Sequence, residues 1–94
     1  MVYKADIVEN LLRYYHSLPT SPESTFCDYK VDIDMALPKL KEHSIPLHDA
    51  LIGVFTNGVP IQEQADIDGV SRMQIHRRLY DGLHLMTMIM NGEF

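Results

Sequence analysis

Cationic and amide side chains gather in one short stretch toward the C-terminal end of the sequence. Between Ser71 and His84 the chain holds three arginines, two histidines and a single acidic residue, Asp81. Arginine and histidine bind phosphate, arginine also pairs with the edge of guanine, and glutamine pairs with the edge of adenine. This stretch therefore indicates contact with a polyanion, although the whole chain carries a net charge of -5.

The residues around this stretch have the spacing of a helix-turn-helix. Ala65 is the small residue where a second helix crosses the first closely, and Gly69 falls four positions later, where the turn needs a positive φ. The turn apolar residue, the N-cap and the two inward-facing residues of the second helix are then Val70, Ser71, Ile75 and Leu79. Six features in this order predict a helix that begins after Ser71 and packs across its predecessor.

The outward face of this second helix follows from the inward direction of Ile75 and Leu79. Its first two turns are the part that such motifs present to the major groove of DNA. Gln62, near the start of the preceding helix, is placed to donate a hydrogen bond to the DNA backbone. The predicted DNA-binding residues are Gln62, Ser71, Arg72, Met73, Gln74, His76, Arg77 and Arg78.

Two positions near the turn leave alternatives open. Asp68 stands where an apolar residue is usual, so we expect Ile67 to take over its burial while Asp68 is solvated or caps the turn. Arg78 either contacts DNA or pairs with Asp81 or Asp49.

Other kinds of chemistry find little support in the sequence. The histidines and the single cysteine, Cys27, lack the spacing of a structural zinc site, and Asp32 and Asp34 lack the glycine and terminal glutamate of a calcium loop. There is no glycine-rich phosphate loop and no Gly-x-Ser-x-Gly elbow. We therefore expect no enzyme activity, no metal and no cofactor.

Amphipathic and helix-breaking patterns predict the elements that position these residues. Apolar side chains at i, i+4 and i+7 predict a helix over residues 4–18, which Pro19 ends. The segment "PTSPES" predicts a link. The alternation in "FCDYKVDID" would suit a short strand, but an isolated strand has no partner here, so an extended lead-in or the start of a helix is expected. Asp34 is expected to cap a helix from Met35 that has Pro38 in its first turn.

Three further helices are expected in the rest of the chain. One covers about residues 47–56, and a short one starts with Pro60 and ends at Gly69. The longest follows its cap Ser71 and runs to about Met90. The fold is expected to be all-α, a small helical bundle with an N-terminal amphipathic helix (1–18), a linker and lead-in (19–33) and a helix-turn-helix domain (34–94).

From about Ile33 to Leu83 the chain resembles the C-terminal promoter-binding domain of bacterial sigma factors, region four. The segment "GVPIQEQADIDGVSRMQIHRRL" is similar to that family's short helix, turn glycine and serine-capped recognition helix. The upstream "IDMALPKLKEHSIPLHDALIGVF" resembles the helix pair that supports it. The opening "YKADIVENLLRYYHSL" is similar to small phage and prophage regulators of the ArpU type.

This resemblance implies a phage- or prophage-type transcription regulator that binds double-stranded DNA through Ser71 to Tyr80, with RNA polymerase as a further partner. One alternative is a helical adaptor that binds polymerase or another protein and uses the helix-turn-helix as a scaffold. Another is a packaging or replication accessory that binds DNA. The segment through Gly58 has five basic residues against eight acids, which favours the adaptor.

The end of the last predicted helix, "LHLMTMIM", is apolar nearly all round and needs cover on more than one face. The cover is expected from the domain's own core and N-terminal helix, from a second copy of the chain in a homodimer, or from another partner. No run reaches the ~20 apolar residues that span a bilayer, and the N-terminus lacks a signal-peptide pattern. We therefore expect a cytoplasmic protein that does not use a membrane.

Overall fold

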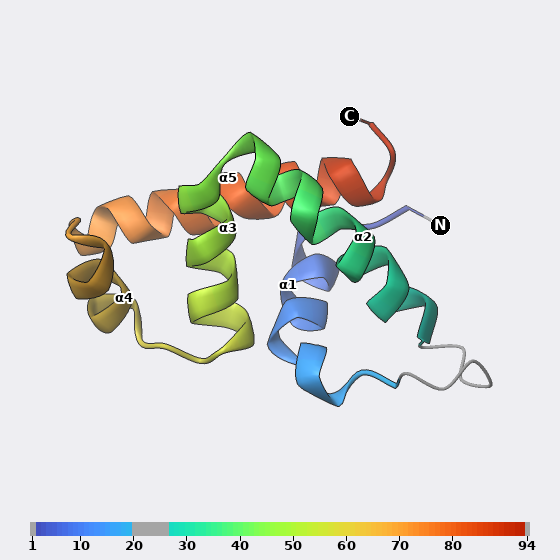
Figure 1. The fold of residues 1–94 in the computed structure, drawn as a ribbon, viewed down its shortest axis with the longest axis horizontal. Coiled ribbons are helices and arrows are strands. Elements are labelled where there is room, and N and C mark those ends of the chain that lie inside the picture. Colours follow the sequence, from blue (N-terminus) through green and yellow to red (C-terminus); the bar gives the residue numbers. More distant parts are fainter. Residues whose placement is uncertain (1, 20–26, 94) are drawn as a thin grey trace.

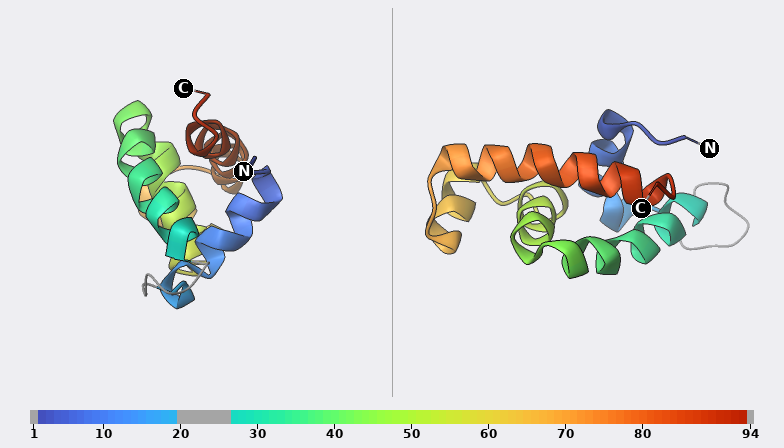
Figure 2. Two further views of the ribbon diagram at one scale, coloured as in Figure 1. Left: turned by 90° about the vertical axis from the view of Figure 1, so that its right-hand side faces the viewer. Right: turned by 90° about the horizontal axis from the view of Figure 1, so that it is seen from above.

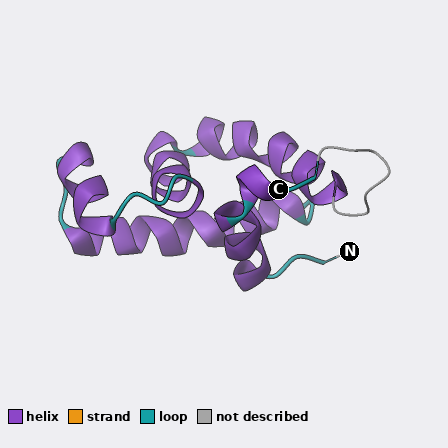
Figure 3. Ribbon diagram, turned by 90° about the horizontal axis from the view of Figure 1, so that it is seen from below, coloured by secondary structure: helices purple, strands orange, loops and turns teal. Residues whose placement is uncertain are grey.

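The computed structural model describes residues 2–19 and 27–93, and all regular elements in these ranges are helices (Figures 1 and 3). In chain order they are α1 (Ala5–Arg13), the 3-10 turn η1 (Tyr15–Ser17), α2 (Cys27–His43), α3 (Ile45–Leu51), the π-helical segment η2 (Ile52–Thr56), α4 (Ile61–Asp68) and α5 (Arg72–Met90). The expected all-helical class is confirmed for these residues.

The longest helix, α5, is the axis of the bundle and contacts α1, α2, α3 and α4. The molecule is elongated, with principal extents of 42 × 27 × 21 Å. Figure 2 shows α4 and the first turns of α5 at one end, whereas α1 and the two chain ends lie toward the other. The largest fully buried side chains come from all of the longer helices except α4: Val8, Leu12, Ile33, Leu40, Leu51, Ile75 and Met86.

A glycine in the middle of α5 permits the close crossing of α3. A Cβ atom on Gly82 would lie 3.1 Å from Cγ of Leu51 and 3.4 Å from the carbonyl oxygen of Leu47. Leu51 is fully buried, so its side chain has no free space into which it could retreat. The absence of a side chain at residue 82 therefore sets the distance between the two helices.

Two tyrosine hydroxyls fasten the N-terminal segment to α2. Tyr3 donates a hydrogen bond to Asp32, and Tyr15 donates one to Asp34. Burial, together with the hydrogen bond to Asp32, raises the pKa of the Tyr3 phenol above its ordinary value. Nζ of Lys30 lies 3.4 Å from the Asp34 carboxylate and 4.4 Å from the centre of the Tyr15 ring.

The first residues of the chain also meet the end of α5. The backbone N–H of Tyr3 donates to Oδ1 of Asn91 at 2.6 Å, and Nδ2 of Asn91 donates to the carbonyl oxygen of Tyr3 at 3.0 Å. Each group therefore satisfies the other, and the pair closes the N-terminal segment onto the C-terminal end of α5.

Helix α2 corrects two predictions. Residues 27–33 are helical, so the extended interpretation is wrong for them and the other one, the start of a helix, is confirmed. Asp34 is not an N-cap, and Pro38 lies in the helix interior. Ile33, Ala36 and Leu40 are buried at helical spacing. The side chains of Asp32 and Asp34 accept hydrogen bonds from Tyr3 and Tyr15, which lie in a distant part of the chain. Of the predicted link at residues 19–24, residues 20–24 lie outside the described residues.

The other predicted helices are found with small shifts. The first ends at Arg13 rather than Leu18 and continues as η1. The helix expected over residues 47–56 begins at Ile45, and its last turn is π-helical. Pro60 is the N-cap of α4 rather than its first residue. The predicted span of α5, from its cap Ser71 to Met90, is confirmed.

The apolar C-terminal half of α5 is covered largely from within the chain. Met86 and Ile89 are buried, and Leu83, Leu85 and Met90 pack partly buried against the core. Both α1 and α2 contact α5, as the prediction of intramolecular cover requires. Within residues 2–19 and 27–93, none of the helices has the length and apolar character needed to cross a membrane.

Substitution of Gly82 tests the crossing of α3 and α5. Alanine in place of a helical glycine normally stabilises by about 1 kcal/mol, whereas overpacking a core costs about 1–3 kcal/mol. We expect Gly82→Ala to lower the free energy of unfolding by about 1 kcal/mol and Gly82→Val to lower it further, as measured by urea denaturation. A gain in stability in the alanine variant would contradict a close crossing at this residue.

Candidate nucleic-acid interface

The start of α5 is held by a glycine turn and a serine cap. Gly69 has φ +69°, and the N–H of Val70 donates to the carbonyl oxygen of Ala65 at 3.0 Å. Oγ of Ser71 accepts a hydrogen bond from the backbone N–H of Gln74 at 3.2 Å. The roles expected of Gly69 and Ser71 are confirmed, and both follow from local backbone chemistry.

The inward faces of α4 and α5 are also as expected. Ala65 and Ile75 are fully buried, and Leu79 is 7% exposed. The small side chain of Ala65 lets α4 lie close to α5, which it contacts directly. With these residues turned inward, the rotation of α5 about its axis is fixed.

Five of the predicted residues lie together on the exposed surface of the first two turns of α5: Arg72, Met73, Gln74, His76 and Arg77. Within the described part of the chain, neither Arg72 nor Arg77 has a hydrogen-bond or ion-pair partner. Arg72 and His76 are one helical turn apart, as are Met73 and Arg77, so each pair lies along the helix. The surface therefore combines two free guanidinium groups with the amide of Gln74 and the apolar tip of Met73.

Arg78 is paired within the protein, unlike Arg72 and Arg77. Its Nη1 lies 3.4 Å from Oδ2 of Asp68, and both side chains are largely buried. The predicted pairing of Arg78 with Asp81 or Asp49 is therefore wrong, and its charge is neutralised behind the turn. The surface has two free arginines where the sequence indicated three.

Asp68 is a structural residue rather than a solvated one. It accepts a hydrogen bond from Nε2 of Gln64 at 3.1 Å in addition to its contact with Arg78. Ile67, which was expected to take over its burial, is 67% exposed, so that expectation is wrong. A carboxylate can replace the usual apolar residue before the turn because two donors satisfy it there.

Gln62 lies on the exposed side of α4, near its N-terminus. Its Nε2 donates to Oδ1 of Asp66 at 3.0 Å within the same helix. The amide nitrogen carries a second N–H, so it can donate to a DNA phosphate while this hydrogen bond is kept.

Two residues that support the surface were not identified from the sequence. Gln64 is 6% exposed, and a Cβ atom on Gly53 would lie 2.1 Å from its Oε1. Gly53 therefore leaves the space in η2 that the Gln64 amide fills, and α4 is seated against η2 as well as α5. The available signal was the Gln64 to Asp68 spacing of four residues, which lets a glutamine bond to an acid on one helix face.

The charges at the start of α5 are the reverse of those that stabilise a helix. The positive end of a helix dipole favours acidic side chains, yet the first turn of α5 contains none and begins with Arg72. The unpaired N–H groups of the first turn add to this positive potential. An anion near Arg72 would thus be attracted both by the guanidinium group and by the positive end of the helix.

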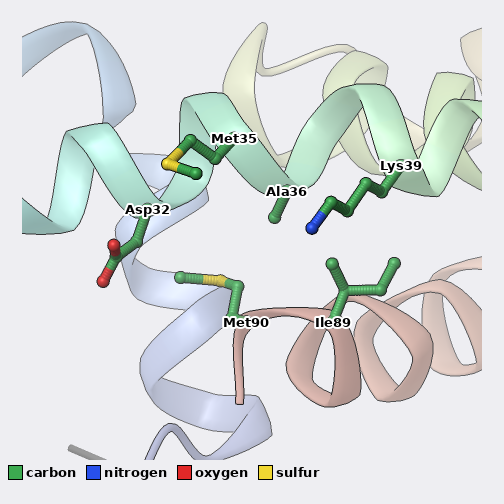
Figure 4. Close-up of a pocket in the computed structure, with 6 residues that line it drawn as sticks. All are labelled: Asp32, Met35, Ala36, Lys39, Ile89 and Met90. Atoms are coloured by element: carbon green, nitrogen blue, oxygen red, sulfur yellow. The ribbon is translucent and has the colours of Figure 1, made fainter. Parts of the chain in front are cut away.

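A cavity of about 120 Å³ lies at the opposite end of the molecule, between α2 and the end of α5 (Figure 4). Four of its six lining residues are apolar, and Lys39 and Asp32 are the charged members. Asp32 already accepts a hydrogen bond from Tyr3. In the ranges that the structure covers, no three His, Cys, Asp or Glu side chains converge to hold a metal ion.

No protein-family model, no curated protein and no solved structure matches the chain. Its function is therefore inferred from the side chains and contacts of α4 and α5.

Substitution of Gly53 and Gln64 tests the support of this surface. Gly53→Ala is expected to destabilise by about 1–3 kcal/mol, because the new methyl group displaces the Gln64 amide from Asp68. Gln64→Ala should cost about 1 kcal/mol through the lost hydrogen bond. In the double variant, measured by urea denaturation, the loss should fall at least 0.5 kcal/mol short of the sum. Strict additivity would show that the two residues do not meet.

Proposed function

We propose that this protein binds double-stranded DNA by inserting the first two turns of α5 into the major groove. The observation that carries the proposal is the pair of free arginines, Arg72 and Arg77, on an exposed helix start at one end of an elongated molecule. Arginine and glutamine form paired hydrogen bonds with guanine and adenine, so Gln74 beside them supplies base selectivity. Gly69 and Ser71 hold the helix start in a defined position.

The unfavourable charge at the start of α5 supports the same function. Sequences that depart from the rules of helix stability do so chiefly at functional sites. Arg72 at the positive helix end lowers the stability of the free protein, and a bound phosphate or base edge offsets that cost.

The resemblance to sigma region four extends the proposal to transcription regulation of the phage or prophage type. Arg78 is neutralised by Asp68 and the net charge is -5, so we expect weak binding to random DNA by one copy. Recognition of a specific site then calls for a second copy of the chain or for RNA polymerase bound alongside.

A second candidate function is that of a protein-interaction adaptor. Val31 and Met35 are 53% and 63% exposed and lie one turn apart on α2. Together with the acidic N-terminal part of the chain, they offer a surface for a protein partner. This candidate predicts no affinity for DNA.

DNA binding is tested by fluorescence anisotropy with a labelled duplex of random sequence and one of promoter length. If the protein neutralises two DNA phosphates, its affinity for the duplex should fall about tenfold between about 50 and about 200 mM salt. The Arg72→Ala, Arg77→Ala double variant should lose about 1–3 kcal/mol of binding free energy per residue. The matched control is Lys39→Ala, Lys41→Ala, which removes the same charge from exposed positions on α2. Equal binding by the two double variants, or no binding at low salt, would refute the proposal and favour the adaptor.

Arg72→Glu separates stability from DNA binding. Placing an acid at the positive end of α5 should raise the free energy of unfolding by about 1 kcal/mol, which corresponds to a rise in Tm of about 4–8 °C. The same change should abolish binding to the duplex. Arg77→Glu, one turn further along, should abolish binding with little gain in stability. A less stable Arg72→Glu variant would reveal a structural role for Arg72.

A further inference from the structure

Met73 is the most exposed large apolar side chain of α5, at 72%. It separates two hollows in the protein surface. One hollow is lined by Ser71, Arg72, Met73 and His76, and the other by Ser71, Met73, Gln74 and Arg77. Met73 is thus an apolar ridge between two groups of hydrogen-bonding side chains.

The major groove of DNA offers one apolar group at its base edges, which is the C5 methyl of thymine. The polar side chains beside Met73 match donors and acceptors, but they cannot use that methyl group. A methionine is unbranched and polarisable, so its tip can adapt to a methyl group at the floor of the groove. An apolar tip among polar neighbours therefore has a specific counterpart in DNA.

The position of Arg77 limits where this counterpart lies. Met73 and Arg77 are four residues apart on α5, so their Cβ atoms are about 5–6 Å apart. Successive bases on one strand rise by about 3.4 Å. Two side chains that start this close together and extend in the same direction reach bases about one to two positions apart.

We infer that Met73 contacts the C5 methyl of a thymine that lies within two positions of a guanine bound by Arg77. This inference rests on the proposed function and adds a base preference to it. It also gives a physical reason for an apolar residue on the most exposed face of a helix start.

Replacement of thymine by uracil removes only the methyl group and leaves base pairing intact. The preferred duplex is first selected from a random library with the full-length protein, and each of its thymines is then replaced singly by uracil. Anisotropy titrations use the unsubstituted protein, Met73→Ala and the control Met88→Ala, since Met88 is an exposed methionine at the other end of α5. At one thymine position, the uracil duplex should bind about fourfold more weakly to the unsubstituted protein and to Met88→Ala. Met73→Ala should not distinguish the two duplexes at that position.

Two results would overturn the inference and are distinguishable. If the protein binds DNA with the expected salt dependence but Met73→Ala responds to every uracil substitution as the unsubstituted protein does, Met73 does not contact a thymine methyl and the proposed function stands. If no duplex binds at low salt, both the inference and the proposed function fail.

Discussion

The contact on which the other helices depend is the crossing of α3 over α5 at Gly82. Because residue 82 has no side chain, Leu51 packs directly onto the backbone of α5 near its middle. The crossing divides α5 into a half that packs with α1 and α2 and a half that packs with α4. The helix α3 continues into η2, where Gly53 makes room for Gln64. One continuous helical segment thus positions both the middle of α5 and the helix that precedes its exposed start.

Elements that depend on neighbouring residues could be predicted from the sequence, whereas the first residue of α2 could not. Gly69 and Ser71 act on backbone groups within a few residues, so their types and spacing were enough to locate the start of α5. The alternating aspartates at the start of α2 left both an extended segment and the start of a helix open, because period two is also the pattern of a strand face. Their partners, Tyr3 and Tyr15, are 29 and 19 residues away, and no local pattern reveals such pairs.

The residues of the candidate surface also divide into those that the sequence predicts and those that it does not. Its exposed members followed from helical geometry once Ile75 and Leu79 were assigned to the core. The use of Arg78 depended on Asp68, which the turn at Gly69 carries back toward α5. Two adjacent arginines therefore differ for geometric reasons, since Arg78 is paired with Asp68 and Arg77 is exposed. The burial of Gln64 depended on the missing side chain at Gly53 in another element, and that relation appears only in three dimensions.

The hydrogen bonds between Tyr3 and Asn91 have a consequence for the order of folding. They join residues 88 positions apart, so forming them from an unfolded chain closes a long loop and carries the larger entropy cost. The contacts among α4, the turn and the start of α5 span far fewer residues and carry a smaller loop-closure cost. Contacts that close over long sequence distances tend to form late in folding. The exposed start of α5 can therefore form its local structure before the N-terminal segment closes onto Asn91.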